Sequence, residues 1–283
     1  MGLLTKAAAV VVPLGLVVGG IAYGVSRHSS PSDDTVGQCT TRVHGLTVVL
    51  TAEQARNASL IAAISVRRGM PAHAATIALA AALQESKLYN LRGGDRDSLG
   101  LFQQRHSQGW GTRQQIMDPV YATNSFYDAL QRVPGYVTMP VTVAAQRVQR
   151  SGYPSAYATY EQDARALASA LTGYSPAAFA CHLAAASATQ PPAARRAVAL
   201  RRALAPAFGS THVRVASGSH VEVAAAGTAR GWALASYVVS HASALGVSSV
   251  SYAGRSWTAG DDRGWQAGTG VGTTGSGAAV VVD

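Results

Sequence analysis

Lysine is nearly absent from this 283-residue sequence, since only Lys6 and Lys87 occur among its 23 basic residues. Charged residues of both signs make up only 13% of the chain, although the formal net charge is +9. A protein that binds nucleic acid usually carries a dense basic patch, and none is evident, so no nucleic-acid partner is expected. Hydrophobic residues make up 48% of the sequence. That content supports sizeable cores, and the length fits one or two domains.

Cysteine is also scarce, with Cys39 and Cys181 as the only two in the chain. Neither stands in a C-x-x-C spacing, which argues against a metal site built on cysteine, and neither a metal nor a cofactor is expected. In an exported protein an even pair of cysteines indicates a disulfide, with two free thiols as the alternative. Closing so long a loop contributes on the order of 4–5 kcal/mol in the chain-entropy model.

The N-terminus has an uncharged apolar run of 18 residues, 7–24, which follows Lys6. This length is near the lower limit for spanning a bilayer, and the small-x-small end at 22–24 also fits a signal peptide. We therefore interpret 1–26 as a signal peptide or membrane anchor and 27–50 as a polar tether. One span cannot form a transport pathway. The remainder is expected outside the cell or in the cell wall, attached to the outer face of the plasma membrane if the segment is uncleaved.

The most informative stretch is 78–104. Its first part is apolar on nearly every face, which predicts a buried helix that ends near Glu85. Two glycines at 93–94 break the helix, and a short apolar run over 99–104 ends in two amides. A carboxylate at the end of a buried helix can hold a proton and act as a general acid. The alternative is a surface glutamate beside Lys87.

Two motifs in this stretch resemble those of a known family. Glu85-Ser86, a glycine-rich turn and then Gly100-Leu101-Phe102-Gln103 resemble the E-S … G-L-M-Q signature of lysozyme-like lytic transglycosylases. The segment 94–103 is also similar to the acidic turn of goose-type lysozymes. The resemblance covers roughly 51–173 and is closest to secreted actinobacterial versions. Phe102 replaces the usual methionine.

The family's third motif, A-Y-N, has no clean match, and Tyr153 and Tyr157 are the candidates for its role. The resemblance implies cleavage of the β-1,4 bond between N-acetylmuramic acid and N-acetylglucosamine in peptidoglycan glycan strands. Glu85 would protonate the leaving oxygen and then accept the proton of the C6 hydroxyl, which leaves a 1,6-anhydro sugar. The expected substrate-binding residues are Ser86, Gln103, Gln104, Trp110, Tyr153 and Tyr157. Trp110 could instead pack its loop against the core.

Other functions remain open. Asp95 or Asp97 could serve as the base for a water molecule, which would make the protein an inverting lysozyme-type hydrolase. Both aspartates could equally cap the turn in which they lie. A non-catalytic protein that binds or scaffolds peptidoglycan is a further alternative.

The rest of the sequence predicts an α+β protein in two parts. Thr51-Ala52-Glu53-Gln54 is a helix-capping signature, and Asp118-Pro119 is typical of a helix start. We expect a mainly helical lysozyme-like domain over 51–182, a linker over 183–206 and a smaller α/β domain over 207–283. The last part is similar to wall-associated modules distantly related to zinc D-Ala-D-Ala peptidases. It has no H-x-x-E-H grouping, so it is expected to be non-catalytic.

Overall fold

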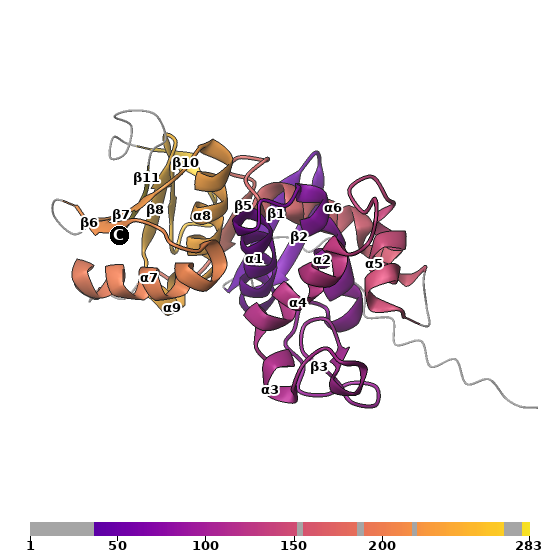
Figure 1. Ribbon diagram of the computed structural model, residues 1–283. Helices are drawn as coiled ribbons and strands as arrows, with labels where there is room; N and C mark the ends of the chain where they lie inside the picture. The colour runs from indigo at the N-terminus through magenta and orange to yellow at the C-terminus, as the bar shows by residue number, and fades with distance from the viewer. Residues whose placement is uncertain (1–36, 152–154, 186–189, 217–219, 269–278) are drawn as a thin grey trace, which may run out of the picture. The chain divides into compact units, whose positions relative to one another are not determined.

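The structure is a computed structural model that describes residues 37–151, 155–185, 190–216, 220–268 and 279–283 (Figure 1). The N-terminal segment 1–26, interpreted as a signal peptide or anchor, lies outside the described residues, as do Tyr153 and the first ten residues of the tether. No helix in the described ranges is long and apolar enough to cross a membrane. The described part has an α+β fold, which confirms the predicted class.

Helices dominate the first half of the chain, and several begin where the sequence predicts. Thr51 and Gln54 form the expected capping box at the start of α1, and the Asp118 side chain caps α4 at Val120. The helical elements are α1 (Ala52–Arg67), α2 (Ala72–Ser86), α3 (Arg113–Ile116), α4 (Pro119–Gln131), α5 (Val141–Gln149) and α6 (Glu161–Leu171), with short 3-10 turns η2 (His106–Gln108) and η3 (Ala156–Tyr160). α2 is buried along nearly its whole length.

A three-stranded antiparallel sheet accompanies these helices, in the order β2-β1-β5. Its strands are β1 (Gln38–Val43), β2 (Leu46–Thr51) and β5 (Phe179–His182). The sequence predicts a tether over 27–50, but residues 38–50 belong almost entirely to this sheet. Cys39 and Cys181 lie opposite each other in the β1–β5 pair and are joined by the predicted disulfide, with their Cα atoms 3.8 Å apart.

The second half of the chain combines helices with an antiparallel sheet. Helix α7 (Ala193–Phe208) occupies much of the segment predicted as a linker, 183–206. The other helices are α8 (Thr228–Ser240) and α9 (Ala242–Leu245). The sheet has the order β10-β9-β8-β11-β7-β6, with strands β6 (Val213–Val215), β7 (Val221–Ala224), β8 (Ser249–Tyr252), β9 (Arg255–Thr258), β10 (Gln266–Ala267) and β11 (Ala279–Val282). Because every pair in this sheet is antiparallel, this part is α+β and lacks the parallel strands of an α/β domain.

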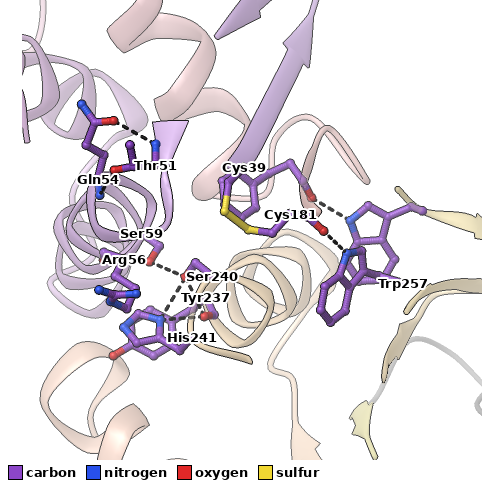
Figure 2. Close-up of a disulfide and its surroundings, with 12 residues drawn as sticks. Cys39, Thr51, Gln54, Arg56, Ser59, Cys181, Tyr237, Ser240, His241 and Trp257 are labelled. Carbon is purple, nitrogen blue, oxygen red and sulfur yellow. Dashed lines mark hydrogen bonds between the residues drawn. A yellow bond between two sulfur atoms is a disulfide. The ribbon is translucent and has the colours of Figure 1, made fainter. Parts of the chain in front are cut away.

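Hydrogen bonds join the two halves near the disulfide (Figure 2). The indole nitrogen of Trp257, on β9, donates to the Cys181 carbonyl at 2.8 Å. The hydroxyls of Ser59 on α1 and Ser240 on α8 are 2.8 Å apart, and both side chains are buried. Residues 35–283 accordingly cluster as one unit. This packing holds α1, which in turn contacts the end of α2.

Candidate functional site

Glu85 is the penultimate residue of α2 and is partly exposed, although the helix before it is buried. The helix ends because Lys87 and Leu88 both adopt left-handed backbone angles, with φ of 55° and 64°. Two side chains of α1 bind this turn: Gln54 donates to the Lys87 carbonyl at 2.9 Å and Asn57 donates to the Leu88 carbonyl at 2.7 Å. These bonds fix the turn that directly follows the end of α2, where Glu85 lies.

Lys87 does not pair with Glu85. Its ammonium group contacts the hydroxyl of Tyr160 and lies 4.2 Å from the centre of that ring. The ion pairs found among the described residues do not include Glu85. Glu85 is therefore a partly exposed helix residue with Lys87 next to its helix end, but the two side chains form no ion pair.

Tyr157 is the direct partner of Glu85. Its hydroxyl donates to Glu85 Oε1 at 2.6 Å, and its ring is fully buried in η3. Burial raises the pKa of Tyr157 far above its usual value, and the hydrogen bond and negative charge of Glu85 raise it further. The phenol therefore stays protonated and acts as a permanent donor. In the described part of the chain, the second oxygen of Glu85 has no hydrogen-bond partner.

Ser86 has a different position from the one predicted. Its hydroxyl donates to the Leu101 carbonyl at 2.7 Å, and the side chain is only 4% exposed. It therefore holds the end of α2 against the Gly100–Gln103 turn, and its burial leaves little surface for the substrate contact predicted from the sequence. The same turn is bound from α5, where the Gln149 amide donates to the Phe102 carbonyl at 2.7 Å. No local sequence signal marks Gln149, because the contact joins residues 47 positions apart.

The two glutamines at the end of the motif separate. Gln103 is partly exposed, adopts a φ of 46°, and donates through its amide to the Gly100 carbonyl at 3.2 Å. It packs so closely on Gly94 that a Cβ there would lie 1.6 Å from Gln103 Oε1. Gln104 is only 2% exposed, and neither polar atom of its side chain has a partner among the described residues. This burial contradicts the prediction that Gln104 contacts substrate directly.

The two aspartates have unequal surroundings. Asp97 accepts hydrogen bonds from Arg105 Nε at 2.5 Å and from the backbone and hydroxyl of Ser107 at 3.0 and 3.1 Å. The Ser107 backbone and then the Arg105 side chain hold the pKa of Asp97 well below its usual range. Such a carboxylate is a poor base and caps the turn. The Asp95 side chain is 91% exposed and lies 3.9 Å from Arg96.

Trp110 is partly buried against the core and also lines a pocket of about 640 Å³. Glu85 does not line this pocket, nor a smaller one bordered by Leu183, Pro191 and Val247. Trp110 thus packs its loop against the core, as one of the two alternatives has it, and its contact with a sugar stays a prediction.

Across the described ranges no three His, Cys, Asp or Glu residues lie close enough to hold a metal ion. His220 contacts Asp283 through Nδ1, and Ser249 donates to the same carboxylate at 3.0 Å. These contacts tie the residue before β7 and the first residue of β8 to Asp283.

The structure is thus an α+β protein in which one carboxylate, that of Glu85, lies at the end of a buried helix. Tyr157 binds this carboxylate, and Ser86 binds the adjacent Gly100–Gln103 turn. Residues 193–276 match a family model described as "VldE, C-terminal domain". The match begins with α7 and covers less than half of the chain. No curated protein matches the sequence.

Proposed function

We propose that the protein is a lysozyme-like peptidoglycan lytic transglycosylase with Glu85 as general acid and base. The observation that supports the proposal is how the two oxygens of the Glu85 carboxylate are bound. Tyr157 binds one of its oxygens at 2.6 Å, while the other has no partner in the described ranges. The E-S … G-L-F-Q motif spans the end of α2 and the Gly100–Gln103 turn, and Ser86 joins its two halves through the Leu101 carbonyl.

In this mechanism Glu85 donates its proton to the bridging oxygen as the bond from C1 to that oxygen breaks. The 2-acetamido group of the substrate assists at C1. The ionised Glu85 then takes the proton of the C6 hydroxyl, and a new bond from O6 to C1 closes the 1,6-anhydro ring. Glu85 thus gives one proton to the leaving oxygen and regains one from O6, and no water is consumed. Tyr157 keeps the carboxylate in place throughout because it does not ionise near neutral pH.

The inverting hydrolase is less well supported. It needs a second carboxylate that accepts a proton from water. Asp97 is bound by Arg105 and Ser107 and has a lowered pKa, while Asp95 extends into solvent with its side chain 91% exposed. The proposal places the protein outside the cell or in the cell wall, and the disulfide fits an oxidising compartment.

Glu85→Gln tests the assignment. The amide keeps the shape and can still bind Tyr157 but has no transferable proton, so glycan cleavage should fall by roughly 10²–10⁴-fold or more. Release of soluble fragments from purified peptidoglycan measures the rate, and thermal unfolding checks the fold. Glu53→Gln is the matched control, because Glu53 is exposed in the first turn of α1. Full activity of Glu85→Gln would refute the catalytic role of Glu85.

A further inference from the structure

The ends of α4 and α5 and the loop of η2 enclose the pocket of about 640 Å³ that Trp110 lines. Its lining combines arginines, amides and aliphatic side chains. The residues are Gln108, Gly109, Trp110, Ala129, Arg132, Val133, Pro134, Arg147, Val148, Gln149 and Arg150. We call it the arginine pocket.

The charge of the arginine pocket is entirely positive, since Arg132, Arg147 and Arg150 line it and no carboxylate does. Throughout the described residues, none of these three side chains makes an ion pair or a hydrogen bond. By contrast, Arg68 at the end of α1 has a carboxylate partner, since it pairs with Asp128 of α4 at 2.6 Å. Three exposed guanidinium groups around one hollow attract an anion, and carboxylates match their planar fork of donors.

The walls of the arginine pocket are held in place. His106 Nδ1 lies 2.7 Å from the Gly111 carbonyl, which closes the loop that carries Trp110. Gly111 lies so close to Tyr121 that a Cβ would be 2.7 Å from the phenol oxygen, so the loop packs directly on α4. A preformed wall lowers the entropy lost when a ligand binds. The indole and the aliphatic residues between the arginines offer apolar contact, which a bare phosphate ion would not use.

The arginine pocket is connected to Glu85 through the Gly100–Gln103 turn. Gln149 lines the pocket and donates to the Phe102 carbonyl at 2.7 Å. The preceding residue, Leu101, accepts the hydrogen bond from Ser86, next to Glu85. One short segment therefore carries contacts to the pocket on one side and to the end of α2 on the other.

We propose that the arginine pocket binds the carboxylates of the acidic peptide attached to the muramyl sugars of the glycan strand. The choice of this ligand rests on the proposed function, because peptidoglycan carries such a peptide on the sugar beside the bond to be cut. Arg132, Arg147 and Arg150 pair with its carboxylates, and the indole and aliphatic residues contact its methyl and methylene groups. The enzyme therefore prefers peptide-bearing strands over bare glycan.

Measurements of binding test this proposal separately from catalysis. Calorimetry on the full chain with Glu85→Gln compares a soluble glycan oligomer bearing acidic peptides, the same oligomer without them, and the free acidic peptide. We expect the peptide to tighten binding by roughly tenfold or more, the equivalent of one good charge-assisted contact. The triple substitution R132Q/R147Q/R150Q should remove this difference and leave the affinity for bare glycan unchanged.

The charge-matched control is R195Q/R202Q/R255Q, which removes three exposed arginines from the second half of the chain. It should keep the preference for the peptide. Equal preference in both triple variants would overturn the proposal, as would the absence of any preference before substitution. Competition by inorganic phosphate but not by the free peptide would overturn the choice of ligand. If wild-type protein cuts no glycan yet the free peptide binds through the arginines, the proposed function fails and the pocket assignment stands.

Discussion

At the scale of single residues, the site depends on how Glu85 is held. The Tyr157 hydroxyl fixes one oxygen, and Gln54 and Asn57 fix the turn that follows the helix. A side chain that is positioned before substrate arrives loses little entropy when it reacts. Tyr157 is a positioning residue in this account, because its ring is fully buried and acts on the substrate through Glu85.

Tyr157→Phe should therefore reduce kcat more than it changes KM. The ring still fills the core, but a hydrogen bond to a charged group, about 1.5–3 kcal/mol, is lost, which corresponds to roughly 10- to 100-fold in rate. Steady-state kinetics on a soluble glycan oligomer measure the two constants. Tyr174→Phe is the control, since Tyr174 is 68% exposed. An unchanged kcat would show that the hydrogen bond does not contribute.

The sequence predicts some of these residues and not others. Glu85 follows from the apolar pattern of its helix, and Tyr157 was one of two candidates suggested by the missing third motif. The contrast between Gln103 and Gln104 could not be predicted, because it depends on the left-handed backbone at Gln103, which turns adjacent side chains to different environments. Gln149 and the three pocket arginines come together only in the fold.

At the scale of elements, the packing of α1 on α8 contains a titratable group. The His241 ring stacks on Tyr237 with 4.0 Å between centroids, and its Nδ1 lies 2.8 Å from the Tyr237 carbonyl (Figure 2). Burial, opposed by that hydrogen bond and aided by the nearby charge of Arg56, lowers the pKa of His241 to about 4. The folded protein thus holds this side chain neutral where the unfolded chain protonates it.

This difference predicts a loss of stability in mild acid. The unfolded chain binds the extra proton below a pH of about 6.5, while the folded chain resists it down to about pH 4, so the free energy of unfolding falls as pH decreases across this window. The loss between pH 7 and 4.5 should be about 2–3 kcal/mol in urea unfolding. The low pKa of Asp97 acts in a separate window, since its contribution is lost only as pH falls below about 4.

His241→Phe retains a ring against Tyr237 but cannot titrate, so its stability should depend much less on pH in this range. His44→Asn is the control because His44 is exposed between β1 and β2, and it should keep the wild-type dependence. If the His241→Phe protein shows the wild-type slope between pH 7 and 4.5, another group causes the acid sensitivity.

Elements with a local signal are the ones the sequence predicts correctly. The capping box at Thr51 and the Asp118-Pro119 start need no distant partner. The sheet of β1, β2 and β5 was missed, since β1 is short and pairs with a strand about 140 residues away. The composition of 183–206 predicts a linker in which the arginine-rich part could form a short basic helix. The helix α7 that forms there is 16 residues long, because Leu200 and Leu204 pack into the core.

At the scale of the whole molecule, hydrogen bonds join the two halves beside the disulfide of the first half. The disulfide links residues 142 positions apart in the sequence, and Trp257 and Trp265 donate to the carbonyls of Cys181 and Phe179 in the adjoining strand. The second half thereby supports the sheet beside which α1 and α6 pack. The net charge of +9 suits an anionic cell wall as a binding surface.

The chemical form of the sugar ends produced by the full chain tests the central claim most directly. Purified peptidoglycan is digested with wild-type protein, and the fragments are identified by mass spectrometry. The account predicts 1,6-anhydromuramyl ends, because in the proposed mechanism Glu85 takes the proton of the C6 hydroxyl. Of the two aspartates considered as a base for water, Asp97 is bound by Arg105 and Ser107, and the Asp95 side chain is 91% exposed. Reducing ends would contradict this mechanism and indicate a hydrolase, and intact glycan would contradict the enzymatic function altogether.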